Sequence, residues 1–327
     1  MKRYDNFTEA YIDLARLLRD EHEWLVSPRG QKIKESLGVQ FRITNPRHRL
    51  PYVKARKFSM SYLVAETIWY MSASDSTEWI SRYAPFWKNI TDDGTTANSA
   101  YGSRIFKPHR RASENVIQWD YVKEELRRDP DSRRAVIHIR SAHDSIHESK
   151  DVPCTLSLQF FIRGGALHLH VSMRSSDIIL GLAYDVPAFT IMQETMANEL
   201  GVELGEYVHT SNSLHCYERD FEMLNDIANS EGPYGFGPMR KLAGSFPTDA
   251  MVKMEEAVST ATNSQILSGF VLVSPPFTKD LDPSDLNLVH DWSRVLLSRR
   301  LRKLKEEESA DFALSHVSDP CYKFFER

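Results

Sequence analysis

Residues 153–177 read PCTLSLQFFIRGGALHLHVSMRSSD, and this stretch predicts two β-strands joined by a tight turn. The run from Leu156 to Ile162 is apolar, and between Leu167 and Met173 apolar residues alternate with polar ones. Such alternation is typical of a strand with one buried face. Glycine readily adopts the positive φ angles of short hairpin turns, so Gly164-Gly165 predicts that the two strands are antiparallel.

The segments on either side of this hairpin show helical or strand-like patterns. We expect helices near residues 8–24, 60–73 and 113–128, from Pro187 to about Leu200, from near His215, and over 286–306. We expect further strands at 135–139 and 204–211, and a loop at the Gly- and Pro-rich residues 232–238. Because no internal repeat or linker interrupts this pattern, it predicts one domain, residues 1–327, of the α/β (α+β) class. A mixed, mostly antiparallel sheet would be flanked by helices.

The composition is that of a protein with a full hydrophobic core. Of 327 residues, 41% are hydrophobic and 26% are charged. The 45 acidic and 41 basic residues give a formal charge of −4, so no global positive field attracts nucleic acid. Three cysteines are too few for a disulfide framework, and no run of about 18 apolar residues occurs. We therefore expect a cytoplasmic protein that binds neither nucleic acid nor membrane.

Cys154 is the strongest candidate nucleophile in the chain. It follows a proline at the start of the first predicted strand, which leaves its sulfur at the end of an element. A buried cysteine is more often a small apolar core residue, and the residue alone leaves that reading open. Arg133, Arg134 and Arg174 supply guanidinium groups of the kind that bind anions and lower the pKa of a nearby thiol.

Other basic or metal-like patterns favour structural readings. His168 and His170 share one face of a strand, but no third ligand has matching spacing, so no metal site is predicted. The basic run from Arg299 to Lys305 predicts the solvated face and last turns of a helix. Residues 232–238 lack the glycine order of a phosphate-binding loop.

Seven short motifs, taken together, carry a resemblance to a known family. They are Glu66-Thr67-Ile68-Trp69, Tyr101-Gly102, Ser132-Arg133-Arg134, Pro153-Cys154, Arg174-Ser175-Ser176-Asp177, Leu180-Gly181-Leu182-Ala183-Tyr184-Asp185 and His215-Cys216-Tyr217. In their order and nearly their spacing they resemble the thymidylate synthase family, from about Arg29 to Asp220. The C-terminus, Phe324-Phe325-Glu326-Arg327, does not resemble the short apolar tail with which thymidylate synthases close over their ligands.

The resemblance implies a homodimer that associates through its sheet faces and uses 5,10-methylenetetrahydrofolate as co-substrate. Cys154 would attack C6 of a pyrimidine nucleotide and so make C5 nucleophilic, because a covalent adduct divides one hard step into easier ones. The nucleotide would be held by Arg29, Arg174, Ser175, Ser176, His215 and Tyr217, with Arg133 and Arg134 contributed across the dimer interface. Glu66 and Tyr101 would organise proton transfers at C5, and Trp87, Asp177 and Gly181 would face the folate.

Two departures from the family pattern point away from uracil. Thymidylate synthases carry asparagine where this chain has Asp185, and histidine where it has Thr155. A carboxylate offers only acceptors, which match the N4 amine of cytosine together with a protonated N3. The resemblance therefore extends to the deoxycytidylate hydroxymethylases and to the CMP 5-hydroxymethylases of mildiomycin-type nucleoside-antibiotic biosynthesis.

Several alternatives remain open at this level. The double arginine Arg133-Arg134 is the usual arrangement of members that use deoxyribonucleotides, so both CMP and dCMP are retained as substrates. Whether water or a hydride completes the reaction does not follow from the residues. The alternatives to a cytidylate hydroxymethylase are a thymidylate synthase that methylates dUMP and a catalytically silent nucleotide-binding regulator.

Overall fold

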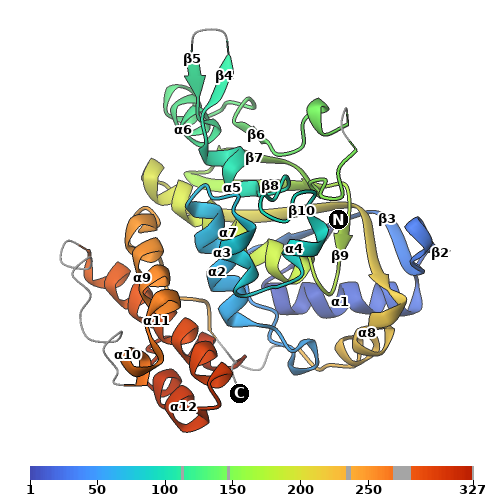
Figure 1. Ribbon diagram of the computed structural model, residues 1–327. Helices are drawn as coiled ribbons and strands as arrows, with labels where there is room; N and C mark the ends of the chain where they lie inside the picture. The colour runs from blue at the N-terminus through green and yellow to red at the C-terminus, as the bar shows by residue number, and fades with distance from the viewer. Residues whose placement is uncertain (112–113, 146–147, 233–236, 268–280, 326–327) are drawn as a thin grey trace.

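An eight-stranded sheet organises the computed structural model, which describes residues 1–111, 114–145, 148–232, 237–267 and 281–325 (Figure 1). The strand order is β1-β3-β10-β8-β7-β6, with β2 paired to β3 and β9 to β10. The strands are β1 Lys2–Tyr4, β2 Trp24–Val26, β3 Ile33–Ile43, β6 Val136–His138, β7 Thr155–Arg163, β8 Ala166–Met173, β9 Ser176–Asp177 and β10 Glu203–Tyr217. Antiparallel and parallel pairs both occur, so the prediction of a mixed sheet is confirmed.

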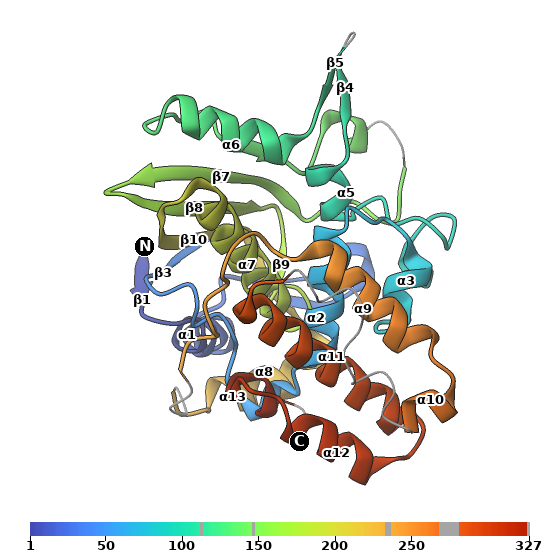
Figure 2. The ribbon, with the colours of Figure 1, turned by 90° about the vertical axis from the view of Figure 1, so that its left-hand side faces the viewer.

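Helices flank the sheet and continue into a C-terminal layer. The helices are α1 Phe7–Asp20, α2 Met60–Met71, α3 Thr77–Ser81, α4 Trp87–Ile90, α5 Tyr101–Phe106, α6 Gln118–Arg128, α7 Leu182–Leu200, α8 Phe221–Ala228, α9 Thr248–Thr260, α10 Asn263–Leu267, α11 Pro283–Lys303, α12 Glu307–Ser315 and α13 Pro320–Lys323. A separate hairpin joins β4 His109–Arg111 to β5 Glu114–Val116. Helices α1 and α7 pack on the sheet, α2 packs on α7, and α9 and α11 contact α2 on its outer side (Figure 2).

The hairpin predicted at the centre of the chain is confirmed. Strands β7 and β8 pair antiparallel from Thr155 opposite Met173 to Arg163 opposite Ala166. Gly164 and Gly165 have φ angles of 60° and 77°, the left-handed conformation that a two-residue turn needs at both central positions. The strongly periodic helices at 8–24, 60–73 and 286–306 are also found, within a few residues of the expected bounds.

Three element boundaries were wrongly predicted. Helix α7 begins at Leu182, so Pro187 lies inside the helix and does not precede it. Helix α6 begins only at Gln118, because residues before it belong to β5. The expected helix from His215 is absent because β10 continues to Tyr217, where it pairs with the start of β3. The following α-helix begins at Phe221.

Parts of three sequence predictions lie outside the described residues. These parts are positions 233–236 of the expected loop, 326–327 of the C-terminal tail and 113 of the expected third helix. Within the described chain, none of the helices combines the length and apolar character needed to cross a bilayer. The described residues also contain no group of three or more His, Cys, Asp or Glu side chains arranged to hold a metal ion.

Candidate active site

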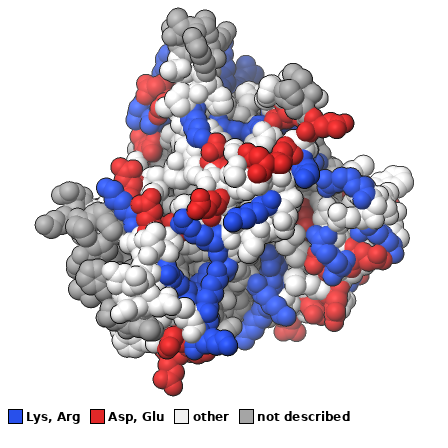
Figure 3. Space-filling view, viewed as in Figure 1, with Lys and Arg blue, Asp and Glu red and all other residues white. Residues whose placement is uncertain are grey.

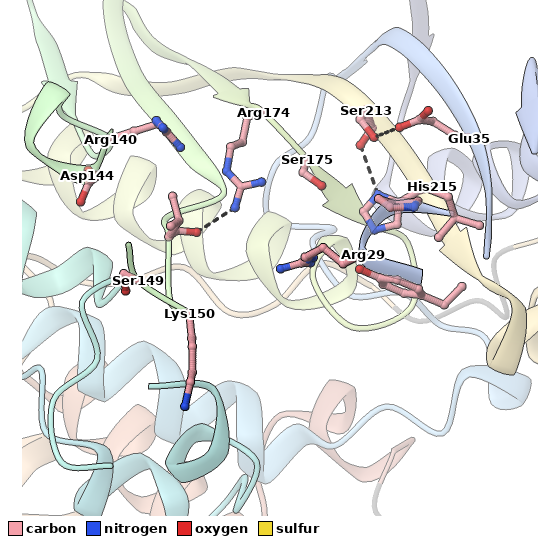
Figure 4. Close-up of a pocket in the computed structure, with 14 residues that line it drawn as sticks. Arg29, Glu35, Arg140, Asp144, Ser149, Lys150, Arg174, Ser175, Ser213 and His215 are labelled. Carbon is pink, nitrogen blue, oxygen red and sulfur yellow. Dashed lines mark hydrogen bonds between the residues drawn. The ribbon is translucent and has the colours of Figure 1, made fainter. Parts of the chain in front are cut away.

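A cavity of about 520 Å³ lies where the start of β3, the link between β8 and β9 and the C-terminal half of β10 meet residues 140–144 and 149–152 (Figure 4). This volume is typical of a site for a small molecule. Five side chains that the sequence predicts as nucleotide-binding line it: Arg29, Arg174, Ser175, His215 and Tyr217. The tertiary structure therefore brings together residues that lie almost 190 positions apart in the chain.

Arg174 connects this cavity to the candidate nucleophile. Its Nε donates to the carbonyl of Pro153 at 2.9 Å and its Nη2 to that of Val152 at 2.8 Å, which places Nη2 3.5 Å from Sγ of Cys154. Burial raises the pKa of the Cys154 thiol, and the nearby guanidinium of Arg174 opposes that rise. Arg174 therefore favours the thiolate that nucleophilic attack requires.

Asp185 occupies the first turn of α7 and is buried. Burial raises the pKa of its carboxyl group well above the usual value, and the neighbouring acids Glu66 and Asp177 raise it further. The same carboxyl and the Cys154 sulfur contribute to the raised pKa of Tyr101, after the larger effect of burial. Asp185, Tyr101, Glu66 and Cys154 thus form one electrostatically coupled group.

Glu66 lies on α2 within a chain of hydrogen bonds. Trp87 Nε1 donates to the Tyr62 hydroxyl at 3.2 Å, and that hydroxyl donates to Glu66 Oε1 at 2.6 Å. Burial raises the pKa of Glu66 to about 7, despite hydrogen bonds from Tyr62 and Tyr70 that lower it. A carboxyl group that titrates near neutral pH is suited to both accepting and donating protons.

The residues predicted to face the folate border the same region. A methyl group at Gly181 would lie 3.3 Å from Oδ2 of Asp185, so glycine leaves the space beside this carboxyl open. Asp177 is joined to Gly181 by a backbone hydrogen bond of 3.0 Å. Trp87, on α4, is linked to this region by its hydrogen bond to the Tyr62 hydroxyl. The Tyr62 ring packs edge-on against the Tyr184 ring, with centroids 4.8 Å apart.

Four predicted nucleotide ligands do not line the cavity of this single chain: Arg133, Arg134, Ser176 and Asp185. Arg133 and Arg134 are exposed and precede β6, away from the lining residues. Ser176 is buried, and its hydroxyl accepts from Ser211 Oγ at 2.8 Å and lies 3.4 Å from His209 Nε2. Residues on β10 therefore engage the Ser176 hydroxyl.

The cavity also contains cations that sequence reasoning missed. Arg140 and Lys150 line it, at the two ends of the polar segment 140–150. In Figure 4, Arg140 points toward Arg174, whereas Lys150 extends away from the other basic groups. Single cations in a polar segment match no motif, so only the folded chain identifies them. Figure 3 shows basic side chains over the centre and lower centre of the face seen in Figure 1, with acidic side chains among them.

A basic cavity, a thiol held beside an arginine, and buried carboxyl groups together are suited to nucleophilic catalysis on an anionic substrate. A sequence model described as thymidylate synthase matches residues 9–238, and the chain belongs to this family.

Comparison with known proteins agrees with this membership. Over 235 residues, 69% of this chain, it is 33% identical to a deoxyuridylate hydroxymethyltransferase of Bacillus phage SP01 and covers 61% of that protein. Over 191 residues, 58% of this chain, it is 29% identical to thymidylate synthase 1 of Bacillus spizizenii and covers 67% of it. The structure of a thermostable thymidylate synthase A from Bacillus subtilis has a similar fold, with a TM-score of 0.60 and 24% identity, over 72% of this chain and 87% of that one. The chain thus spans less than two thirds of the length of the phage relative.

Proposed function

We propose that this protein transfers a one-carbon unit from methylenetetrahydrofolate to C5 of a cytidylate and releases the 5-hydroxymethyl nucleotide. The observation that carries the proposal is the buried carboxyl group of Asp185, which acts electrostatically on the Cys154 thiol. The Cys154 thiolate bonds to C6, which makes C5 nucleophilic. Methylenetetrahydrofolate, when bound, supplies the carbon that C5 acquires.

The raised pKa of Asp185 bears on how the base is read. A neutral carboxylic acid has one donor and one acceptor, so it pairs with N3 and the N4 amine of neutral cytosine. As sulfur adds to C6, negative charge develops on the ring, and in this proposal the acid transfers its proton to N3. The ionised Asp185 then faces a protonated N3 and an amine, a charge-assisted pair that stabilises the adduct.

Glu66 and Cys154 carry out the steps that follow transfer of the one-carbon unit. Glu66, with a pKa of about 7, is suited to take the C5 proton as tetrahydrofolate leaves the one-carbon unit. It is then suited to direct a water molecule to the exocyclic methylene that remains on C5. Loss of the C6–sulfur bond then returns the Cys154 thiolate. Water and not hydride completes the reaction in this proposal, which the names of two phage relatives support.

A second candidate substrate is deoxyuridylate, because the phage relatives are named deoxyuridylate hydroxymethyltransferases. A neutral Asp185 also satisfies uracil, since its carbonyl accepts from N3–H and its hydroxyl donates to O4. The base preference therefore depends on whether proton transfer from Asp185 to N3 assists the addition of sulfur to C6. Only cytosine can accept that proton, because N3 of uracil already carries one.

A substrate panel tests the proposal directly. Purified protein is incubated with methylenetetrahydrofolate and CMP, dCMP, UMP or dUMP, and product masses are measured. A gain of about 30 Da on a cytidylate, absent in Cys154→Ser, is expected from covalent installation of a hydroxymethyl group. A gain of about 14 Da would refute hydroxymethylation, and faster turnover of UMP or dUMP would refute the cytidylate assignment. Conversion in Cys154→Ser equal to wild type would remove the covalent mechanism.

A further inference from the structure

A second basic cavity, of about 300 Å³, lies between the end of α3 and helices α9 and α11. Its cationic lining residues are Arg82, Arg299, Arg300 and Lys303. None of them lines the nucleotide cavity, and α9 and α11 lie beyond residue 238, where the family match ends. Arg299 and Arg300 are half-buried, so the expectation that this basic run is a solvated helix face is wrong for both.

The cavity carries an excess of positive charge. Four cations and no carboxylate occur among the described residues that line it. The adjacent acid is Glu255, which is buried and lies 3.4 Å from Arg82. Burial raises the pKa of Glu255, which disfavours the negative charge that would offset the cations of the cavity. Cations gathered around a partly enclosed space repel one another, and a bound anion relieves that repulsion.

Hydrogen bonding within the chain uses only some of the available donors. Arg300 donates to the carbonyls of Val258 at 2.6 Å and Ala261 at 2.5 Å, and so stabilises the C-terminal end of α9. Arg299 Nη2 donates to the Tyr83 carbonyl at 2.6 Å, but its buried Nε has no hydrogen-bond partner among the described residues.

Lys303 lies at the open side of the cavity. Its Nζ donates to the carbonyl of Arg82 at 2.9 Å, and an ammonium group has three N–H donors. Burial, Arg299 and Arg300 all lower its pKa, which agrees with mutual repulsion around the cavity. Lys303 therefore presents N–H donors that protein acceptors do not fully satisfy, whereas both Nη atoms of Arg299 have acceptors in Ser61 and Tyr83.

We propose that this cavity binds a phosphate group carried by a small molecule. Guanidinium and ammonium groups that surround one cavity commonly bind phosphate oxygens. The lining of this cavity contains both kinds of group. The volume is at the lower end of small-molecule sites, which suits a phosphate with a small substituent. The site is independent of the nucleotide cavity and of the reaction proposed there.

Calorimetric titration with pyrophosphate tests this site. All measurements use the full chain carrying Arg174→Gln, which weakens anion binding in the nucleotide cavity. We expect one equivalent of pyrophosphate to bind, Lys303→Gln to weaken it at least about tenfold, and Lys303→Arg to retain it, because charge-assisted hydrogen bonds dominate. Lys253→Gln, an exposed change on α9 outside the cavity, is the matched control.

The outcomes separate the possibilities. Inorganic phosphate should compete with pyrophosphate, whereas the dicarboxylate glutarate should compete poorly. Failure to bind pyrophosphate, equal losses in Lys303→Gln and Lys253→Gln, or tighter binding of glutarate would each overturn the proposal. Circular dichroism of Lys303→Gln and Lys303→Arg establishes that any loss of binding does not arise from unfolding.

Discussion

Burial, more than contact with opposite charge, determines the pKa values of the predicted catalytic and folate-facing carboxyl groups. Glu66, Asp177 and Asp185 are all acids with raised pKa values, and burial is the largest cause for each. Repulsion from Glu66 and from Asp177 adds to the effect of burial at Asp185. All three pKa values are therefore shifted toward the protonated form, and that of Glu66 rises to about 7.

Replacing Asp185 by asparagine tests how the base is read. The carboxamide would retain one donor and one acceptor but no transferable proton, so activity on uridylates should survive better than activity on cytidylates. We expect the ratio of kcat/KM for dUMP to that for dCMP to rise at least about 100-fold, as for substrates distinguished by hydrogen bonding. Asp226→Asn, an exposed change on α8, is the control and should leave the ratio unchanged. An equal loss on both bases in Asp185→Asn would contradict the prediction.

The raised pKa of Glu66 predicts a pH-dependent cost in stability. Below pH 4.5 the side chain is protonated in both the folded and unfolded states, and the cost is absent. As pH rises to about 7, only the unfolded state ionises, so the free energy of unfolding falls. The difference of about 2.5 pKa units corresponds to a cost on the order of 3 kcal/mol at pH 8.

Glu66→Gln removes this titration while keeping an acceptor for Tyr62. We expect the variant to be more stable than wild type at pH 8 and similar at pH 4, measured by urea unfolding. Glu78→Gln, at an exposed position of α3, is the control. A constant difference between Glu66→Gln and wild type across this pH range would show that burial does not raise the pKa as described.

At the scale of elements, close packing of α5 against α2 positions two candidate catalytic side chains, Tyr101 and Glu66. A methyl group on Gly102 would overlap the backbone carbonyl of Tyr70, so glycine is required for the two helices to approach. Tyr101 and Tyr70 stack with ring centroids 5.2 Å apart at this contact. The contact therefore fixes Tyr101 on α5 relative to Glu66 on α2.

Gly102→Ala should force α5 and α2 apart. We expect a loss of about 3 kcal/mol in the free energy of unfolding, the upper range for overpacking, together with lower kcat. Gly244→Ala adds a methyl group where no heavy atom lies within 4 Å and serves as the control. Unchanged stability and activity in Gly102→Ala would mean that the helices separate without cost.

At the scale of the whole molecule, the position of Arg133 and Arg134 supports the proposal of a homodimer with shared sites. Both are exposed and lie outside the cavity of their own chain. If a partner's pair completes the site, Cys154→Ser and Arg134→Ala homodimers are each impaired. Subunit exchange between them should then restore activity to about a quarter of the wild-type level, because half of random dimers contain one intact site. No gain over the unmixed variants would contradict the sharing.

Local sequence pattern was sufficient for the central hairpin, the strongly periodic helices and the order of the site motifs. These features depend on neighbours a few positions apart, through glycine turns, alternation and helical spacing. The full length of β10 was not predictable in this way, because its end is stabilised by pairing with β3, which is distant in the chain. The same limit explains the wrong start of α7, where tertiary packing accommodates Pro187.

Some features of the candidate site could likewise be predicted from local sequence, and others could not. The identity of Cys154, Arg174 and Asp185 as functional candidates came from residue types and motif order alone. Their protonation behaviour, the participation of Arg140 and Lys150, and the second basic cavity emerged only from the folded chain. Desolvation and charge coupling are set by distances between segments far apart in sequence, and those distances exist only after the chain has folded.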